Sequence, residues 1–215
     1  SSAASDVYKR QIIEFAASIA GLVLVTVNPS FQEDELKYVL EKSQSEALYV
    51  AKSFRGNPMW DIAKKVTEKM PSVKRMVDIQ DWDELFGLND GGSVSPTNSL
   101  PEVDPRDPVQ IQFTSGTTGF PKGAKLHHMG LFNNAKSFQT RMGLEKGDHW
   151  LNCMPMFHTS GAGMATLGCL AMRATHYIME RFDAKNWCKV VEKEKINFLT
   201  AVPTMFVEIL EAVSY

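Results

Sequence analysis

The sequence predicts an α/β fold with mainly parallel sheets in two lobes. Segments typical of strands alternate with segments typical of helices along most of the 215 residues, and this alternation is the pattern of βαβ units. Hydrophobic residues make up 44% of the chain, which is enough for a real core and argues against disorder. A stretch rich in glycine, proline and polar residues, 87–108, separates an earlier part of the pattern from a later one.

This division predicts the domain organisation. Residues 12–86 form a partial first lobe, 87–108 a surface linker, and 109–215 a second, truncated lobe. Residues 1–11 resemble a translated sequencing-adapter read-through and are interpreted as a non-native leader. Because residues 208–215 break off in a helical pattern without glycine or proline, we expect that both ends of the chain were cut.

The start of the first lobe shows how each element is inferred. Leu22–Val27 is a continuous apolar, β-branched run, which is typical of a strand buried on both faces. Ser30 and Glu33 fit a capping box, so we expect a helix from there to about Ser43. The apolar residues at helical spacing form its predicted inner face: Leu36, Val39 and Leu40.

The same reasoning places the remaining elements. In the first lobe, helices are predicted at 12–20 and 61–70 and strands at 48–51 and 73–79. In the second lobe, strands are predicted at 109–113, 149–154, 175–179 and 197–202, and helices at 127–141, 162–172, 185–195 and from Pro203 onward. The last helix places three residues at core spacing: Phe206, Ile209 and Leu210.

Composition excludes several classes of function. The formal charge is −2 and there is no polybasic run, so neither a nucleic acid nor a charged membrane surface is indicated as partner. The longest apolar stretch, 16–27, falls short of the roughly 20 residues of a transmembrane helix. Three widely spaced cysteines argue against a disulfide scaffold. We therefore expect an intracellular, reducing location, either the bacterial cytoplasm or an organelle matrix such as that of the mitochondrion.

The most informative segment runs from Phe113 to Gly123, with the sequence FTSGTTGFPKG. Four hydroxyl residues and three glycines lie close together directly after a predicted strand. Glycines let backbone N–H groups converge on one point, and such a nest binds anionic oxygens. Lys122 adds a cation. The spacing differs from G-x-x-x-x-G-K-[ST], which argues against a P-loop GTPase or ATPase. A phosphate-binding loop is favoured over a flexible surface loop.

With this loop, the sequence resembles the adenylate-forming superfamily of acyl-CoA synthetases, firefly luciferase and peptide-synthetase adenylation domains. The loop FTSGTTGFPKGA resembles the signature of that superfamily. Gly21–Leu36, His128, the segment PMFHTSG at 155–161 and the helix start at 202–205 support it. PMFHTSG and VPTMF are most similar to fatty acyl-CoA synthetases, and the likeness runs from about residue 12 to the end. His127 and Gly130 depart from the usual threonine and asparagine, at positions without expected chemistry.

The resemblance implies a ligase that consumes ATP, with Mg²⁺, and transfers an activated fatty acid to CoA. The implied ligands of the ATP phosphates are Thr114, Ser115, Gly116, Thr117, Thr118, Gly119 and Lys122. Lys122 and His158 are the implied catalytic residues, and Phe157, His158 and Gly161 the implied substrate pocket. The family's Tyr-Gly-x-Thr-Glu motif, ribose-binding aspartate and late catalytic lysine do not occur in this chain, so we expect the fragment alone to be inactive and poorly stable.

Other readings stay open. The substrate can be another carboxylic acid, aryl or amino, and the chain can be a truncated nucleotide-binding module without catalysis. His158 can be a core histidine, and methionines 154, 156, 164 and 172 can line an acyl pocket or pack the core. No cysteine lies at metal spacing from another, so no metal site is predicted within the protein, and Cys153 is predicted to be a buried thiol. The sequence does not determine acyl chain length or oligomeric state.

Overall fold

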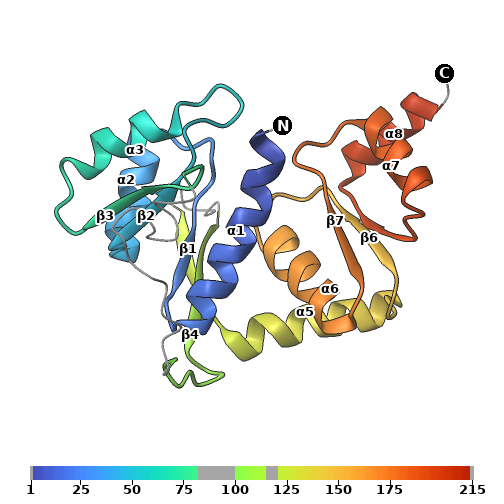
Figure 1. Cartoon of the computed structure of the whole chain (residues 1–215), viewed down its shortest axis with the longest axis horizontal. Coiled ribbons are helices and arrows are strands. Elements are labelled where there is room, and N and C mark those ends of the chain that lie inside the picture. The colour runs from blue at the N-terminus through green and yellow to red at the C-terminus, as the bar shows by residue number, and fades with distance from the viewer. Residues whose placement is uncertain (1, 82–99, 115–120, 214–215) are drawn as a thin grey trace. The chain divides into compact units, whose positions relative to one another are not determined.

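The computed structural model describes residues 2–81, 100–114 and 121–213, with side chains from residue 8 onward (Figure 1). Strand pairing within the described residues is parallel for β1–β4, β2–β3, β6–β7 and β6–β8, and antiparallel for β4–β5. The predicted α/β class with mainly parallel sheets is therefore confirmed.

Contacts group the chain into two compact units. We name Tyr8–His127 the N-terminal unit, and Ser1–Val7 together with His128–Tyr215 the C-terminal unit. The division predicted at 87–108 differs from this grouping, because β4 follows that stretch and still pairs with β1, which precedes it. Residues 82–99 of the predicted linker lie outside the described residues.

The N-terminal unit contains two small sheets, with strand orders β1-β4-β5 and β2-β3. Helix α1 spans Ser2–Ile19 and therefore covers most of the predicted leader. The other elements follow in chain order: β1 (Leu24–Thr26), α2 (Glu33–Ser43), β2 (Ala47–Val50), α3 (Met59–Thr67), β3 (Arg75–Asp78), β4 (Pro108–Thr114) and β5 (Lys122–His127).

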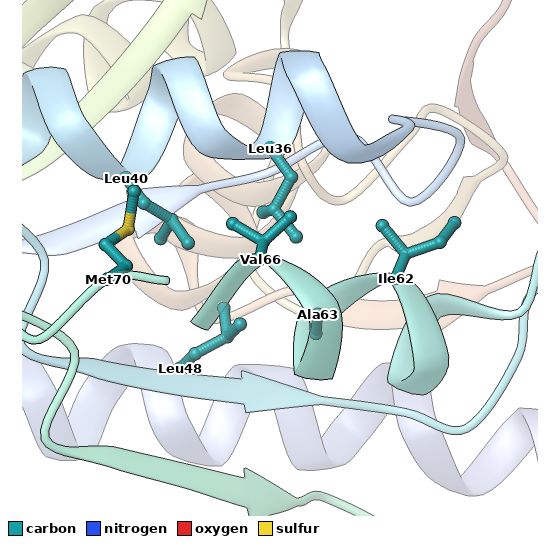
Figure 2. Close-up of a cluster of buried hydrophobic side chains, with 7 residues drawn as sticks. All are labelled: Leu36, Leu40, Leu48, Ile62, Ala63, Val66 and Met70. Atoms are coloured by element: carbon teal, nitrogen blue, oxygen red, sulfur yellow. The ribbon is translucent and has the colours of Figure 1, made fainter. Parts of the chain in front are cut away.

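The core of this unit lies where α2 and α3 cover the β2–β3 sheet (Figure 2). Helical spacing brings Leu36 and Leu40 to one face of α2, because residues four apart in a helix are neighbours. Seven buried side chains form this cluster: Leu36, Leu40, Leu48, Ile62, Ala63, Val66 and Met70. The predicted inner face of α2 is confirmed, since Val39 is buried as well.

The predicted start of α2 is wrong by two residues. The N-cap is Gln32 rather than Ser30, and the Gln32 backbone N–H donates to Glu35 Oε2 at 2.9 Å. The reason lies in Asn28, whose side chain accepts from the Ser30 N–H at 3.0 Å. Ser30 thus belongs to an Asx turn that precedes the helix, and the helix is capped two residues later.

The prediction of a strand buried on both faces at Leu22–Val27 is also wrong. Strand β1 covers only Leu24–Thr26, and Leu22 and Val23 are 61% and 41% exposed. Gly21, with φ of +68°, follows the end of α1 and turns the chain there. β1 then lies at the edge of the described sheet, paired with β4 alone, so it lacks the neighbour that would bury it.

The C-terminal unit is built on one parallel sheet with strand order β7-β6-β8. Its elements are α5 (His128–Met142), β6 (His149–Asn152), the π-helix η1 (Ser160–Leu167), α6 (Gly168–Met172), β7 (Thr175–Ile178), α7 (Ala184–Lys193), β8 (Phe198–Thr200) and α8 (Pro203–Val213). Successive residues of a strand point to opposite faces. Trp150 accordingly packs in a cluster with Leu144 and Cys169, and Leu151 in a second cluster with Trp187 and Ile209.

Both faces of this sheet are therefore covered, one by α5 and α6 and the other by α7 and α8. Trp150 is fully buried, and its ring meets Phe198 of β8 edge-on with centroids 4.8 Å apart. A parallel sheet requires such cover, because helices connect its strands across both faces. The C-terminal unit is a three-layer α/β arrangement.

Two predictions about helices in this unit need correction. The helix expected over 162–172 is a π-helix, η1, followed by a single α-helical stretch, α6. In α8, Ile209 is buried but Phe206 and Leu210 are 44% and 69% exposed. Ile209 and Met205 of α8 pack in the cluster that contains Trp187 of α7, so spacing alone overestimated the buried face.

Candidate functional site

The predicted phosphate-binding segment lies at the end of a hairpin in the N-terminal unit. Strand β4 ends at Thr114 and β5 begins at Lys122, and these two residues pair directly. The Thr114 hydroxyl lies 3.4 Å from the Lys122 carbonyl oxygen, to which it donates. Five predicted phosphate ligands connect the two strands and lie outside the described residues: Ser115, Gly116, Thr117, Thr118 and Gly119.

Strand β5 itself was not predicted. Its sequence, KGAKLH, has no alternation of apolar and polar residues, and all but Leu126 are exposed. Gly123, expected to belong to the loop, is a strand residue that faces Phe113. A Cβ at Gly123 would lie 3.2 Å from Phe113 Cζ and 3.2 Å from Ile111 Cγ2. Glycine therefore allows the β4 side chains to pack across the hairpin.

The hairpin end is held by Tyr38 of α2. Its hydroxyl donates to the Pro121 carbonyl oxygen at 3.0 Å. Its ring meets Phe113 edge-on, with centroids 6.3 Å apart. The residue directly before Lys122 is thus tied to a helix whose inner face is core. Sequence reasoning missed Tyr38, because only the fold brings residue 38 near residue 121.

The hairpin end has the groups that anion binding requires. Directly opposed residues in a strand pair project to the same side of the sheet, so the Thr114 hydroxyl and the Lys122 side chain share one side. Both residues are exposed. A hydroxyl donor and a mobile ammonium on one side can contact phosphate oxygens.

The second part of the predicted site lies in the C-terminal unit, after β6. The connection that follows β6 leads to η1 and α6 on one face, whereas β8 is followed by α8 on the other. β6 and β8 are neighbours, so the connections diverge at the carboxyl ends of these two strands, which makes this edge a topological switch point. Ligands bind at such switch points in open α/β sheets. Pro155–Gly161 directly follows this edge.

His158 is exposed, so the reading as a core histidine is excluded. Its Nδ1 accepts from the Ser160 backbone N–H at 3.2 Å and lies 3.0 Å from Ser160 Oγ. An Nδ1 that accepts carries no proton, so the proton of the neutral ring sits on Nε2. His158 therefore presents an outward Nε2–H, which can donate to a carboxylate or phosphate oxygen.

The other two predicted pocket residues differ in burial. Phe157 is half-buried, and Gly161 is buried at the start of η1. A Cβ on Gly161 would come within 2.8 Å of the Met154 carbonyl oxygen, closer than van der Waals contact allows. Gly161 thus lets the turn after β6 lie against the first turn of η1. Its role is close backbone packing, and no side chain could take its place.

The cysteine and methionine side chains close to the segment after β6 have packing roles. Cys153 is buried, and its Sγ lies 3.6 Å from the Thr200 carbonyl oxygen. Burial raises the pKa of the Cys153 thiol, which keeps it protonated at neutral pH. Met172 packs against the Trp150 cluster, and Met156 Sδ lies 3.5 Å from Asn152 Nδ2. These contacts favour core packing for both methionines.

Within the described ranges, no group of three or more His, Cys, Asp or Glu side chains could hold a metal ion. Over the same residues, no helix is both long and apolar enough to cross a membrane. Thr114 and Lys122 belong to the N-terminal unit, and Phe157, His158 and Gly161 to the C-terminal unit. Within each unit, the predicted residues that the structure describes lie close together along the chain and in the fold.

Comparison with known proteins identifies the chain's relatives. The pattern of a family described as AMP-binding enzyme matches residues 8–214. YngI of Bacillus subtilis, whose name marks it as a proposed acyl-CoA synthetase, is 33% identical over 95% of this chain and 41% of its own length. The mitochondrial medium-chain acyl-CoA ligase ACSF2 of Macaca fascicularis is 32% identical over 94% of this chain and 37% of its own length.

A solved structure has the same fold. The o-succinylbenzoate coenzyme A synthetase MenE of Bacillus subtilis, in complex with AMP, matches with a TM-score of 0.72 and 25% identity, over 92% of this chain and 47% of that one. The chain spans about two-fifths of the curated relatives named above, 41% of one and 37% of the other.

Proposed function

Because this chain belongs to the family of AMP-binding enzymes, we propose that it carries the ATP-phosphate site and the carboxylate site of an AMP-forming fatty acyl-CoA synthetase. The observation that carries the proposal is the hairpin end. Thr114 and Lys122 pair there on one side of the sheet, at the two ends of the segment rich in glycine and hydroxyls.

The proposed reaction has two steps. A carboxylate oxygen of the fatty acid attacks the α-phosphorus of ATP, a new C–O–P linkage forms, and the bond to the β-phosphate breaks to release pyrophosphate. The thiol of CoA then attacks the acyl carbon, so that a C–S bond forms, AMP leaves with the C–O electron pair, and the thiol proton is released. Such phosphoryl chemistry depends on positioning and on neutralising charge.

Lys122 and Thr114 have the first of these tasks. The Lys122 ammonium neutralises charge on the β- and γ-phosphates. The Thr114 hydroxyl exchanges its 3.4 Å bond to the Lys122 carbonyl oxygen for a bond to one of the phosphate oxygens. Ser115, Gly116, Thr117, Thr118 and Gly119 supply further N–H and hydroxyl donors in this proposal. Tyr38 supports the site by holding the Pro121 carbonyl at 3.0 Å.

His158 has the second task, together with Phe157 and Gly161. With Nδ1 bound to the Ser160 N–H at 3.2 Å, its Nε2–H donates to the acyl carboxylate or to an α-phosphate oxygen. Phe157 adds an apolar wall, and Gly161 lets the backbone come close. The edge at the end of β6 thereby holds the attacking carboxylate.

Mg²⁺ is proposed only as a companion of ATP. The described residues offer no group of three or more acidic, histidine or cysteine side chains for it. Mg²⁺ is usually bound through substrate phosphates with one or two carboxylates, and in this proposal it enters with ATP. CoA is the second substrate, and no residue of this chain is assigned to it.

One alternative substrate class has support. MenE, similar in fold and 25% identical, is named for o-succinylbenzoate, an aryl acid, whereas ACSF2 is named for medium-chain acyl groups. We propose a fatty acid because PMFHTSG resembles fatty acyl-CoA synthetases, and an aryl acid is the second candidate. A location in the cytoplasm or an organelle matrix remains a prediction.

The test uses the full-length protein that the source gene encodes. Exchange of labelled pyrophosphate into ATP is measured with octanoate, palmitate, benzoate and an amino acid. We expect exchange with a fatty acid and little without one. Exchange with benzoate alone would move the substrate to the aryl class. No exchange with any acid, but measurable ATP binding, would support the non-catalytic module and overturn the proposal.

A matched pair of lysine variants tests the phosphate site. Lys122 and Lys125 are both exposed on β5, but an odd separation places them on opposite sides of the strand. Lys122→Ala should raise KM for ATP about tenfold, because a lost charge-assisted contact costs about 1.4 kcal/mol. Lys125→Ala should change it less than twofold. Equal effects would show that only the general charge of β5 matters.

A further inference from the structure

The side chain of Gln139 is a buried polar group that the proposed chemistry does not use. It lies in α5, fully buried, and its Nε2 donates to the Met164 carbonyl oxygen of η1 at 2.8 Å. The amide can be oriented in only one way, because a carbonyl oxygen must receive an N–H. Its Oε1 has no hydrogen-bond partner in the part of the chain that the structure describes. A buried amide that keeps one unpaired atom destabilises the fold, so its presence in the core calls for an explanation.

Gly168, the first residue of α6, fits around this amide. The Gly168 backbone N–H donates to the carbonyl oxygens of Met164 and Ala165. The Met164 carbonyl oxygen therefore accepts two hydrogen bonds, one from the Gly168 N–H and one from Gln139 Nε2. A Cβ at Gly168 would lie 2.7 Å from Gln139 Cγ, inside van der Waals contact. Because Gln139 is fully buried, its side chain cannot swing into solvent to make room. Gln139 in this position therefore requires glycine at residue 168.

This contact lies where the helix changes type. Residues up to Leu167 form the π-helix, with the Met164 N–H donating to the Thr159 carbonyl at 2.7 Å, and α-helix follows from Gly168. π-helices are rare and are found most often at functional sites. The Thr166 hydroxyl donates to the Gly161 carbonyl at 3.1 Å, which supports the wide turn from inside.

The π-helix begins at the candidate carboxylate site. The Ser160 N–H donates to His158 Nδ1, and the Gly161 and Ala162 N–H groups both donate to the His158 carbonyl at 3.1 Å. If η1 relaxed to α-helix, residues before it would shift by about one position, a rise of about 1.5 Å and a turn of roughly 100°. The imidazole of His158 would then point elsewhere.

We propose that Gln139 is a positioning residue that holds η1 in π-helical register and thereby sets where the His158 Nε2–H meets the acyl carboxylate. This inference rests on the proposed function for the role of His158. A displacement of about 1 Å at a reacting group can cost a hundredfold in rate. The bond from Gln139 to Met164 thus acts on catalysis through His158 and touches no substrate.

The first experiment measures kinetics of the full-length protein with Gln139→Met, which keeps the length of the side chain and removes its donor. We expect kcat/KM for the fatty acid to fall at least tenfold and KM for ATP to change less than twofold. The control is Asn134→Met, an exposed amide on the same helix, which should leave both unchanged. A fall in ATP affinity of the same size would indicate a general structural role and overturn the inference.

A coupling test guards against a variant that merely folds badly. Gly168→Ala should lower kcat/KM about tenfold when Gln139 is present. In a Gln139→Ala background the same glycine change should lower it less than twofold, because the space is free. Independent effects of the two changes would contradict the mutual fit.

The last readout does not depend on activity. Amide hydrogen exchange at Ser160 should become at least tenfold faster in Gln139→Met, while Trp150 and Leu151 of β6 keep their rates. If the wild-type enzyme exchanges no pyrophosphate but this shift occurs, the proposed function fails and the structural role of Gln139 stands. If the wild type is active and neither kinetics nor Ser160 exchange changes, the inference about Gln139 fails alone.

Discussion

The two parts of the candidate site are built on opposite kinds of sheet. In the N-terminal unit, Thr114 and Lys122 end an antiparallel hairpin whose strand β5 is almost entirely exposed. In the C-terminal unit, His158 follows a parallel sheet that is covered on both faces, with Trp150 and Leu151 buried on opposite sides. The hairpin can present a mobile cation to a highly charged phosphate, whereas the segment after the covered sheet orients the His158 ring through the bond from the Ser160 N–H to Nδ1. Rigidity should therefore be concentrated in the second.

The largest effect should come from removing the central aromatic residue of the parallel sheet. Trp150→Ala should lower the free energy of unfolding by about 3 to 5 kcal/mol, because it leaves a large cavity between β6, β8 and α6. Urea unfolding followed by circular dichroism measures this. Phe113→Ala, half-buried in the hairpin, should cost less. Equal costs would mean that both sheets are equally packed.

The second-largest effect should be a loss of stability of the C-terminal unit at acid pH. Burial lowers the pKa of His176 in β7 to about 4 from an ordinary value of 6.5, so the folded protein holds this ring neutral. The unfolded chain then binds more protons below pH 6.5, and stability is lost as pH falls from there to 4. The difference between the two pKa values of His176 corresponds to about 3 kcal/mol in the free energy of unfolding.

The measurement compares urea unfolding between pH 7 and 4.5 for the wild type and His176→Gln. The variant should lose less stability over this range. His127→Gln, an exposed histidine on β5, should follow the wild type. Parallel curves for all three proteins would show that His176 is not buried neutral.

Disturbing the close backbone packing in the first turn of η1 should have a smaller effect on stability. Gly161→Ala should destabilise by about 1 to 3 kcal/mol, because its Cβ meets the backbone oxygen of Met154, which cannot move cheaply. Gly163→Ala is the matched control, since the nearest atom to its Cβ would be the end of the Leu131 side chain, at 3.0 Å, and no backbone atom would lie so close. Thermal unfolding monitors both. A larger cost at Gly163 would contradict the described turn.

The smallest effect on stability should come from releasing the hairpin end from α2. Tyr38→Phe removes the hydrogen bond to the Pro121 carbonyl and should cost about 1 kcal/mol. In the full-length enzyme it should also weaken ATP binding a few fold, because Pro121 precedes Lys122. Tyr49→Phe on β2, 43% exposed, is the control. Unchanged ATP binding in Tyr38→Phe would show that the hairpin end needs no anchor.

Several elements could be predicted because their signals are local. The stripe of Leu36, Val39 and Leu40 needs only helical spacing, and it is buried as expected. Strand β4 before the loop is indicated by two β-branched residues and an aromatic one directly ahead of the glycine-rich segment, Val109, Ile111 and Phe113. Such patterns persist in the fold because they set which face of an element can leave water.

Other features depended on partners distant in sequence. β5 carries no apolar alternation and becomes a strand because β4 offers a free edge. η1 reads as ordinary helix, and its π-helical register depends on Gln139, 25 residues from Met164. The exposed side of α8 could not be told from its buried side by spacing, because Phe206, Ile209 and Leu210 are equally apolar.

The sequence by itself determined the α/β class, the family and the chemical character of the hairpin end, because composition, alternation and a dense motif of glycine and hydroxyls are local properties. Tertiary structure alone decided that Tyr38 anchors Pro121, that His158 presents its Nε2–H, and that Gln139 and Gly168 hold a π-helix. Each of these depends on close packing between segments or on the exact turn of the backbone. Spacing along the chain carries no information about either.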